Sequence, residues 1–214
     1  MGENLGTPAE AIRFGLAREL AEQAFAPLSV LLIEREALPS RRTPGLPDDA
    51  FIRGAVPMTK QEVRAAALAK LAVTPTDTLW DVGAGTGSVS VELALAAPRG
   101  HVYAVECDPE ACGLIRQNRE TFHACNLTLV EGRAPAALAD LPAPDAVFIG
   151  GTKGGMEAVV DTVLARNPNA RICISAIALE TLGAAIAALT ARGLTAEVTQ
   201  IAVSRTKPAG RLHL

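Results

Sequence analysis

The chain has 214 residues, 49% of them hydrophobic, and this length suffices for one substantial core with a small appendage. The formal net charge of −3 and the isoelectric point near 5.7 supply no general attraction for a polyanion. Aromatic residues make up 3% of the chain, so few rings are available for stacking on bases. These values argue against a nucleic-acid partner.

The cysteines show neither the paired spacing of a metal site nor a recognisable secretion signal before them, so we expect reduced thiols, no metal and a cytoplasmic location. They are Cys107, Cys112, Cys125 and Cys173. Residues 172–191 carry one charge, on Glu180. A buried strand followed by an alanine-rich helix ending at Gly193 explains this stretch better than a membrane span.

The first part of the chain predicts a helix over residues 8–23 and a strand over 28–33. A linker rich in proline and arginine follows over residues 37–50. We therefore expect a separate segment over residues 1–36 and the main domain over 51–214.

A helix is predicted from Thr59 to about Leu71, because Thr59 and Glu62 have the spacing of a capping box. Capping of this helix alone would explain why a threonine stands at position 59. Lys60 and Arg64 lie four residues apart, which places them on one helix face. That face is either solvated or a small anion site.

The centre of the sequence is a strand over residues 78–82 that runs through a turn with three alternating glycines into a helix over 88–95. Glycines let the backbone turn tightly and bring its N–H groups close to a ligand. The last of them, Gly87, comes one residue too early for a dinucleotide fingerprint. Asp81 would repel a pyrophosphate but suits a ligand with an ammonium and a sulfonium group, such as S-adenosylmethionine.

The next strand, over residues 101–105, ends at Glu106, about 20 residues after the turn, where a carboxylate can accept hydrogen bonds from ribose hydroxyls. Taken alone, Glu106 could equally be a solvated residue at the end of a strand. Further strands are predicted over 127–130, 146–149, 172–175 and 194–203, alternating with helices. This α/β order predicts a Rossmann-like, doubly wound, mostly parallel sheet with helices on both faces and a ligand cleft at the carboxyl ends of its strands.

The loop over residues 150–155 has four glycines around Lys153 at the start of a helix, which suits carboxylates or phosphates. A flexible loop without function is the alternative. The polar and aromatic tetrad expected of an enzyme that methylates a nucleobase amine is absent from this loop. The tail over 204–214 is basic, and a seventh strand would begin only at Leu212, so we expect the domain to lack its last strand.

Two stretches of the sequence resemble a known family. They are Phe51-Ile52-Arg53-Gly54 with Val56-Pro57-Met58-Thr59-Lys60-Gln61-Glu62-Val63-Arg64, and Leu79-Trp80-Asp81-Val82-Gly83-Ala84-Gly85-Thr86-Gly87-Ser88. The resemblance is to the decarboxylating precorrin methyltransferases of cobalamin biosynthesis, of the precorrin-6Y type, and covers residues 50–211. Residues 4–34 resemble the end of the tetrapyrrole methylase domain that precedes this domain in fused proteins.

The resemblance implies a class I methyltransferase fold, S-adenosylmethionine as cofactor and a precorrin as substrate. It places the cofactor on the glycine turn, to which Asp81 is added from the residues themselves. The resulting set is Thr59, Asp81, Gly83, Ala84, Gly85, Thr86, Gly87, Glu106, Gly132, Arg133 and Ala134. Candidates for binding the substrate's carboxylates are Lys60, Arg64, Lys153 and Arg205. The resemblance also implies a homotetramer and a covalently linked upstream methylase domain.

The implied reaction methylates a meso carbon of the macrocycle and removes carbon dioxide from an acetate side chain. An electron-rich carbon needs no prior deprotonation, so positioning should do most of the work, and no catalytic residue is assigned. Two other functions remain open from the sequence. One is a tRNA adenine methyltransferase, and the other is a non-catalytic scaffold that only binds the cofactor.

Overall fold

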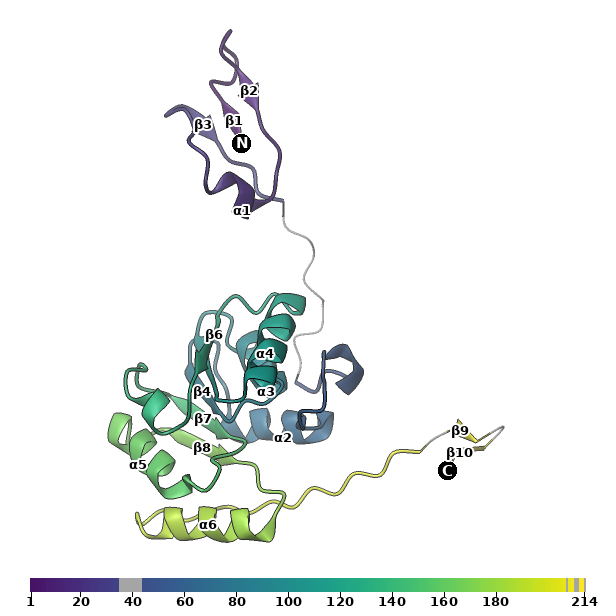
Figure 1. Cartoon of the computed structure of the whole chain (residues 1–214), viewed down its shortest axis with the longest axis vertical. Coiled ribbons are helices and arrows are strands. Elements are labelled where there is room, and N and C mark those ends of the chain that lie inside the picture. Colours follow the sequence, from purple (N-terminus) through teal and green to yellow (C-terminus); the bar gives the residue numbers. More distant parts are fainter. Residues whose placement is uncertain (35–43, 207, 210–211, 214) are drawn as a thin grey trace. The chain divides into compact units, whose positions relative to one another are not determined.

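The computed structural model describes residues 1–34, 44–206, 208–209 and 212–213. The chain forms two compact units, Met1–Ser40 and Arg41–Leu214. Figure 1 shows the elements of both, coloured along the sequence.

The first unit contains a small antiparallel sheet. Its strands are β1 (Gly2–Glu3), β2 (Ala11–Ile12) and β3 (Ser29–Val30), in the order β2-β1-β3. The helix expected over 8–23 is reduced to α1 (Ala17–Leu20), and the strand expected over 28–33 is reduced to β3. The helix prediction is wrong for residues 11–13 because their backbone pairs with β1, and the N–H of Arg13 donates to the carbonyl of Met1 at 2.8 Å.

The second unit is built on a five-stranded parallel sheet, as the sequence predicts. Its strands are β4 (Thr78–Val82), β5 (His101–Glu106), β6 (Leu127–Glu131), β7 (Ala146–Ile149) and β8 (Arg171–Ile174), in the order β6-β5-β4-β7-β8. The first strand is therefore central, with later strands added on both sides. This order opens a crevice at the carboxyl end of β4, where the connections leave in opposite directions.

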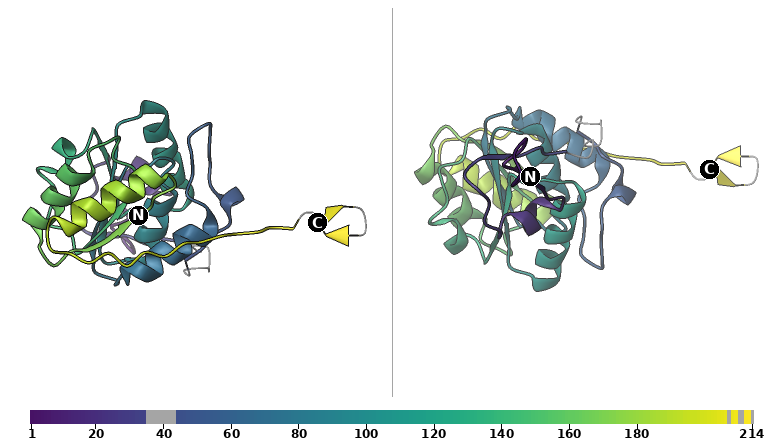
Figure 2. Two further views of the ribbon diagram at one scale, coloured as in Figure 1. Left: turned by 90° about the horizontal axis from the view of Figure 1, so that it is seen from below. Right: turned by 90° about the horizontal axis from the view of Figure 1, so that it is seen from above.

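Helices cover both faces of this sheet. They are α2 (Gln61–Leu71), α3 (Ser88–Ala96), α4 (Pro109–Thr121), α5 (Met156–Arg166) and α6 (Leu179–Thr190), with short 3-10 turns η1 (Asp48–Ala50) and η2 (Ala136–Leu138). One hydrophobic core joins the sheet to α2, α3 and α4, and a second joins it to α5 and α6. Figure 2 shows α6 lying across the sheet in the view from below. The expected Rossmann-like, doubly wound parallel sheet with helices on both faces is confirmed.

The only tryptophan of the chain, Trp80, lies on β4 and is fully buried against the core of α5 and α6. Its indole Nε1 donates a hydrogen bond to the carbonyl of Pro142 at 3.1 Å. A buried indole needs such a partner, because an unpaired N–H in the core is costly.

The amino ends of the strands are closed by short polar contacts. The carboxylate of Asp77 accepts the backbone N–H of Thr74 at 2.8 Å and pairs with Arg171 from β8. The amide of Asn126 donates to three carbonyls of the α3–β5 connection, including that of Ala97 at 2.8 Å. A Cβ on Gly100 would lie 2.1 Å from the carbonyl oxygen of Asp77, so the backbones touch directly.

The linker predicted over residues 37–50 starts outside the described residues and is wrong for its second half. The N–H of Gly45 donates to Glu92 on α3 at 2.6 Å, and that of Leu46 at 3.1 Å. Leu46 is buried in the core. Proline and arginine are common in linkers, but this stretch packs because its backbone donors find a buried carboxylate.

The strand predicted over residues 194–203 is not formed. This segment has alternating apolar residues, but no strand is assigned between α6 and β9 (Pro208–Ala209) in the described part of the chain. Alternation alone does not make a strand, because the backbone also needs a neighbouring strand to pair with. At the expected start of a seventh strand, β10 (Leu212–His213) pairs with β9 in antiparallel fashion.

Candidate functional site

The glycine turn connects β4 to α3 in a backbone conformation that only glycine adopts easily. Gly83, Gly85 and Gly87 have φ angles of +72°, +56° and +75°. The N–H of Gly83 donates to the carbonyl of Val105 on β5 at 2.9 Å. A Cβ on Gly83 would lie 2.3 Å from the carbonyl oxygen of Gly151, so this turn and the loop after β7 are in backbone contact.

Glu106 ends β5 beside this turn and is 8% exposed. Its Oε2 accepts the N–H of Gly85 at 2.9 Å, and its Oε1 accepts the N–H groups of Cys107 at 2.8 Å and Asp108 at 2.9 Å. These bonds fix the carboxylate, which has about four lone-pair directions and retains capacity for hydroxyl donors. The position is the one that the sequence predicts for holding a ribose.

Asp81 lies on β4, two residues before Gly83, and is fully buried. Its Oδ2 accepts a hydrogen bond from the Ser90 hydroxyl on α3, while its Oδ1 has no partner among the described residues. Burial raises the pKa of Asp81 to about 7, and the negative charge of Glu106 adds to the rise although the Ser90 hydrogen bond opposes it. The hydroxyl of Thr86, also buried, is likewise without a partner in the described structure.

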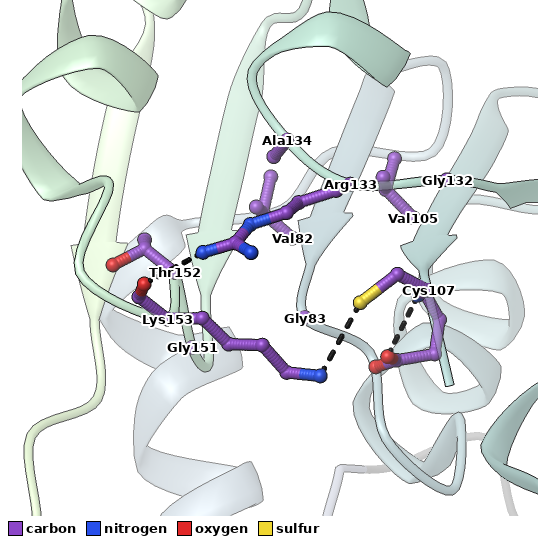
Figure 3. Close-up of a pocket in the computed structure, with 11 residues that line it drawn as sticks. Val82, Gly83, Val105, Cys107, Gly132, Arg133, Ala134, Gly151, Thr152 and Lys153 are labelled. Carbon is purple, nitrogen blue, oxygen red and sulfur yellow. Dashed lines mark hydrogen bonds between the residues drawn. The ribbon is translucent and has the colours of Figure 1, made fainter.

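A cleft of about 140 Å³ opens over the carboxyl ends of β4, β5, β6 and β7. Figure 3 shows the side chains of Arg133 and Lys153 reaching across it from opposite sides. Arg133 Nη2 donates to the carbonyl of Lys153 at 2.9 Å, and Lys153 Nζ donates to Cys107 Sγ at 3.4 Å. The lining residues are Val82, Gly83, Val105, Glu106, Cys107, Gly132, Arg133, Ala134, Gly151, Thr152 and Lys153.

The cleft thus unites six residues that the sequence predicts for cofactor or substrate: Gly83, Glu106, Gly132, Arg133, Ala134 and Lys153. Cys107 and Thr152 were missed, although both stand within three residues of a strand end, where lining residues are expected. Ala84, Gly85, Thr86 and Gly87 belong to the turn itself but do not line the cleft.

The segment before α2 is held differently from the prediction. The helix begins after Lys60, and its first N–H, from Gln61, donates to Asp48 Oδ1 at 2.9 Å. The predicted capping box is wrong, because Asp48 satisfies this end and Glu62 pairs with Arg205 instead. Thr59 is half-buried outside the lining of the cleft, and its carbonyl accepts a hydrogen bond from Arg64.

Arg64 does not bind ligand at the surface, which corrects the sequence-based expectation. Its side chain is fully buried, with Nε donating to Glu92 at 2.7 Å and Nη1 donating to Asp48 at 2.9 Å. Lys60 is exposed, so the two cations do not share a solvated face. Helical spacing places Arg64 correctly, but it does not reveal the two carboxylates that make its burial tolerable.

Arg205 lies in the C-terminal segment and is half-exposed. It pairs with Glu62 at 2.7 Å and with Asp48 at 3.3 Å. It does not line the cleft. Any anionic ligand at Arg205 would therefore compete with two carboxylates.

The residues at the strand ends fit an adenosyl ligand that carries a positive charge. Glu106 offers acceptors for hydroxyls, the glycine turn admits close backbone approach, and Asp81 has an oxygen without a partner. No group of three or more His, Cys, Asp or Glu side chains is placed to hold a metal within the described residues. No helix in the same part of the chain is long and apolar enough to cross a membrane.

Comparison with known proteins assigns the family. The family model described as a precorrin methyltransferase domain matches residues 49–214, which include the whole sheet and the cleft. The chain belongs to the precorrin methyltransferase family. The match begins at η1 and agrees with the packing of residues 44–50 on the second unit.

Relatives of this precorrin methyltransferase are similar over most of the domain. The probable cobalt-precorrin-6B C(15)-methyltransferase (decarboxylating) of Pyrobaculum calidifontis is 47% identical over 79% of this chain and 88% of its own length. The precorrin-6Y C(5,15)-methyltransferase [decarboxylating] of a Sinorhizobium species is 40% identical over 75% of this chain, which corresponds to 40% of that longer protein. The crystal structure of precorrin-6y C5,15-methyltransferase from Geobacter metallireducens has 40% identity and a TM-score of 0.75, over 80% of this chain and 92% of that one.

Proposed function

We propose that this chain is an S-adenosylmethionine-dependent C-methyltransferase that also decarboxylates a precorrin of the precorrin-6Y type. The observation that carries this proposal is the 40–47% identity to relatives named as decarboxylating precorrin methyltransferases. The cleft with Glu106 beside the glycine turn supports it independently. A tRNA adenine methyltransferase is disfavoured, because the relatives described above are named for precorrins.

The cofactor would lie along the carboxyl ends of β4, β5 and β6. Glu106 would accept the ribose hydroxyls, and the glycine turn would face the amino-acid part, with the carboxyl of Asp81 buried two residues before the turn. The loop Gly132 to Ala134 would flank the adenine, and its first N–H donates to the carbonyl of Glu106 at 2.8 Å. When bound, S-adenosylmethionine supplies an electrophilic methyl group on a positively charged sulfur.

The substrate's carboxylates would bind to cations at the same edge of the sheet. Lys153 is placed for this role, because its ammonium lies over the cleft and donates only to a thiol in the described structure. Lys60 is exposed before α2 and can serve a second carboxylate. To bind a substrate carboxylate, Arg205 would have to give up its ion pair with Glu62.

The chain's contribution to the reaction is mainly positioning. The glycine turn and Glu106 hold one reactant while Lys153 orients the other, which converts a bimolecular step into one between fixed partners. Decarboxylation breaks the bond between the acetate carbon and its carboxylate, and the electron pair passes into the macrocycle, which later takes up a proton. Val82 and Val105 line the cleft and would help to exclude water from the carboxylate that leaves.

The test is mass spectrometry of a purified precorrin after incubation with the chain and S-adenosylmethionine labelled in its methyl group. We expect a product that has gained one labelled methyl and lost one carbon dioxide. Methylation without loss of carbon dioxide would reduce the proposal to a methyltransferase. Binding of the cofactor without any transfer would favour the scaffold alternative.

We also propose that residues 1–36 belong to an upstream tetrapyrrole methylase domain. The first unit has three two-residue strands and leaves Phe14 93% and Leu32 76% exposed, which is unusual for a complete domain. A homotetramer remains a proposal from the family resemblance, and a cytoplasmic location remains a proposal from the cysteine pattern. Ile177 and Leu179 are exposed at the start of α6 and would be buried by association. Light scattering after gel filtration measures the oligomeric state.

A further inference from the structure

Arg64 joins segments of the second unit that are far apart in the sequence. Its guanidinium donates to Glu92 on α3, to Asp48 on η1, to the carbonyl of Leu46 at 2.5 Å and to the carbonyl of Thr59. The group also lies 4.7 Å from the centre of the Phe51 ring. No other side chain of the described structure donates hydrogen bonds to as many separate segments.

We propose that Arg64 is a positioning residue for the cofactor, because it fixes the segment over residues 56–59 against the glycine turn. This inference rests on the proposed function, since it concerns the same cofactor site. Arg64 itself does not line the cleft, so it acts through the backbone that it holds.

The contacts lead from Arg64 to the turn by two routes. The first runs through Glu92, which lies on α3, the helix that begins directly after the turn at Gly87. The second runs through the carbonyl of Thr59 to the preceding backbone. There the carbonyl oxygen of Pro57 lies 3.3 Å from where a Cβ on Gly85 would stand. Arg64 therefore contacts both the helix that follows the turn and the backbone segment that packs on Gly85.

The charges around Arg64 explain why it holds these segments firmly. Arg64 is the cation between two buried or nearly buried carboxylates, and their side chains are 12% exposed for Asp48 and 1% for Glu92. Burial alone would raise the pKa of Asp48, but the hydrogen bond and charge of Arg64 bring it below its ordinary value. Removing the cation would leave the buried Glu92 without its cationic partner and Asp48 with only the longer pair to Arg205, so the segments that Arg64 joins would be held less firmly.

Geometry explains why the residue is arginine. The planar guanidinium donates from Nε, Nη1 and Nη2 in three fixed directions, and each nitrogen meets a different acceptor here. A lysine ammonium is a single point and cannot reach Glu92, Asp48 and the carbonyl of Leu46 together. A lysine at this position should keep the charge and lose the alignment.

The matched control is Arg171, which pairs with the buried carboxylate of Asp77 at the amino ends of the strands. Both arginines belong to the same unit, and each pairs with an aspartate whose side chain is 12% exposed or less. Only Arg64 contacts the segment that covers the turn. R171M should therefore lower stability without changing the cofactor site.

The experiment compares R64K, R64M and R171M. Calorimetry measures the dissociation constant of S-adenosylhomocysteine at a temperature where each variant is folded by circular dichroism. We expect all three to lose thermal stability. We expect the dissociation constant to rise about ten- to a hundredfold for the Arg64 variants only, because small displacements of a positioning group cost this much. R64K keeps the charge and serves if R64M does not fold.

Two outcomes would overturn the inference. Wild-type affinity in a folded R64K or R64M would show that Arg64 only stabilises the fold. An equal loss of affinity in R171M would show that any destabilisation weakens the site. If the wild-type chain itself does not bind S-adenosylhomocysteine, the proposed cofactor is wrong as well, whereas unchanged affinity in the variants leaves the proposed function intact.

Discussion

The two ends of the parallel sheet differ in how their polar groups are satisfied. At the amino ends, Asp77 and Asn126 bind neighbouring backbone, and the only unpaired buried side-chain atom described there is Nε of Arg171. At the carboxyl ends, Asp81 and Thr86 are buried and each keeps an oxygen without a partner in the described structure, and Val82 and Gly83 between them in sequence line the cleft. Unsatisfied groups next to open space indicate a ligand site, whereas satisfied groups at a closed end indicate stability.

The strongest test of this difference substitutes glycines at the two ends. G83A and G100A each force a Cβ against a backbone carbonyl oxygen, at 2.3 Å and 2.1 Å. Because backbone cannot yield cheaply, we expect each to lower the free energy of unfolding by about 2–4 kcal/mol, measured by urea denaturation. Only G83A should also abolish binding of S-adenosylhomocysteine in the folded protein.

Gly113 provides the control for these substitutions. It lies within α4, and a Cβ there would meet no atom within 4 Å. G113A should stabilise the protein by up to about 1 kcal/mol, because alanine favours a helix over glycine. If G100A also eliminated binding in folded protein, the distinction between the two ends would fail.

The second prediction uses the opposite pKa shifts of two aspartates on β4 and just before it. Burial raises the pKa of Asp81 to about 7 from 3.8. The folded state therefore binds more protons than the unfolded state, and the stability from protonated Asp81 is full below pH 4 and lost as pH rises to 7. The wild type should lose about 4 kcal/mol relative to D81N over this range, measured by urea denaturation at several pH values.

Asp77 should behave in the opposite way. Although its burial raises the pKa, the hydrogen bonds from Thr74 and the charge of Arg171 bring it below 3.8. The stability that Asp77 contributes is present at neutral pH and lost on acidification through its lowered pKa. At neutral pH, D77N should therefore be less stable than the wild type, and this difference in the free energy of unfolding should disappear in acid. The same trend for D81N would contradict the assigned environment of Asp81.

A third prediction concerns Glu106 at the carboxyl end of β5. E106Q removes the charge that would accept ribose hydroxyls, and hydrogen bonds to charged groups contribute about 1.5–3 kcal/mol. We expect the dissociation constant of S-adenosylhomocysteine to rise about 10- to 150-fold in calorimetry. E131Q is the control, because Glu131 ends the neighbouring β6 but is exposed and pairs with Arg116. Similar losses in both variants would remove Glu106 from the ribose site.

The smallest effect is expected for Lys153. K153A should raise the KM for the precorrin about two- to fivefold, because an exposed ion pair contributes at most about 1 kcal/mol. The affinity for the cofactor should change less. Lys70, an exposed lysine in the last turn of α2, provides the control K70A, which should leave both unchanged. Equal effects of K153A on cofactor and substrate would argue against the anion-binding loop.

The sequence predicted most of the elements that carry local signals and a buried partner. The five parallel strands and the glycine turn match the structure, because hydrophobic period and glycine chemistry act over a few residues. The helix over 8–23 and the strand over 194–203 failed, because their outcome depends on distant or absent pairing partners. The burial of Arg64 was missed for the same reason, since Glu92 lies 28 residues away.

The candidate site was predictable where residues directly follow strands. Glu106 and Lys153 could be placed at one edge from topology, whereas Arg133 was expected there from the family resemblance. The reach of Lys153 to Cys107 and the contact between Gly83 and Gly151 depend on loop conformation, which no sequence period encodes. Thr59 could be expected near the turn only by resemblance, and the hydrogen bond from Arg64 to its carbonyl depends on the burial of that arginine.

Trp80 gives the protein an intrinsic optical probe in a useful place. The chain has one tryptophan and it stands on the central strand, two residues before the backbone reaches Val82 and the turn. All indole emission therefore comes from a single environment, and a red shift on adding denaturant reports the opening of the middle of the sheet. Every variant considered above can be followed by this native fluorophore without labelling.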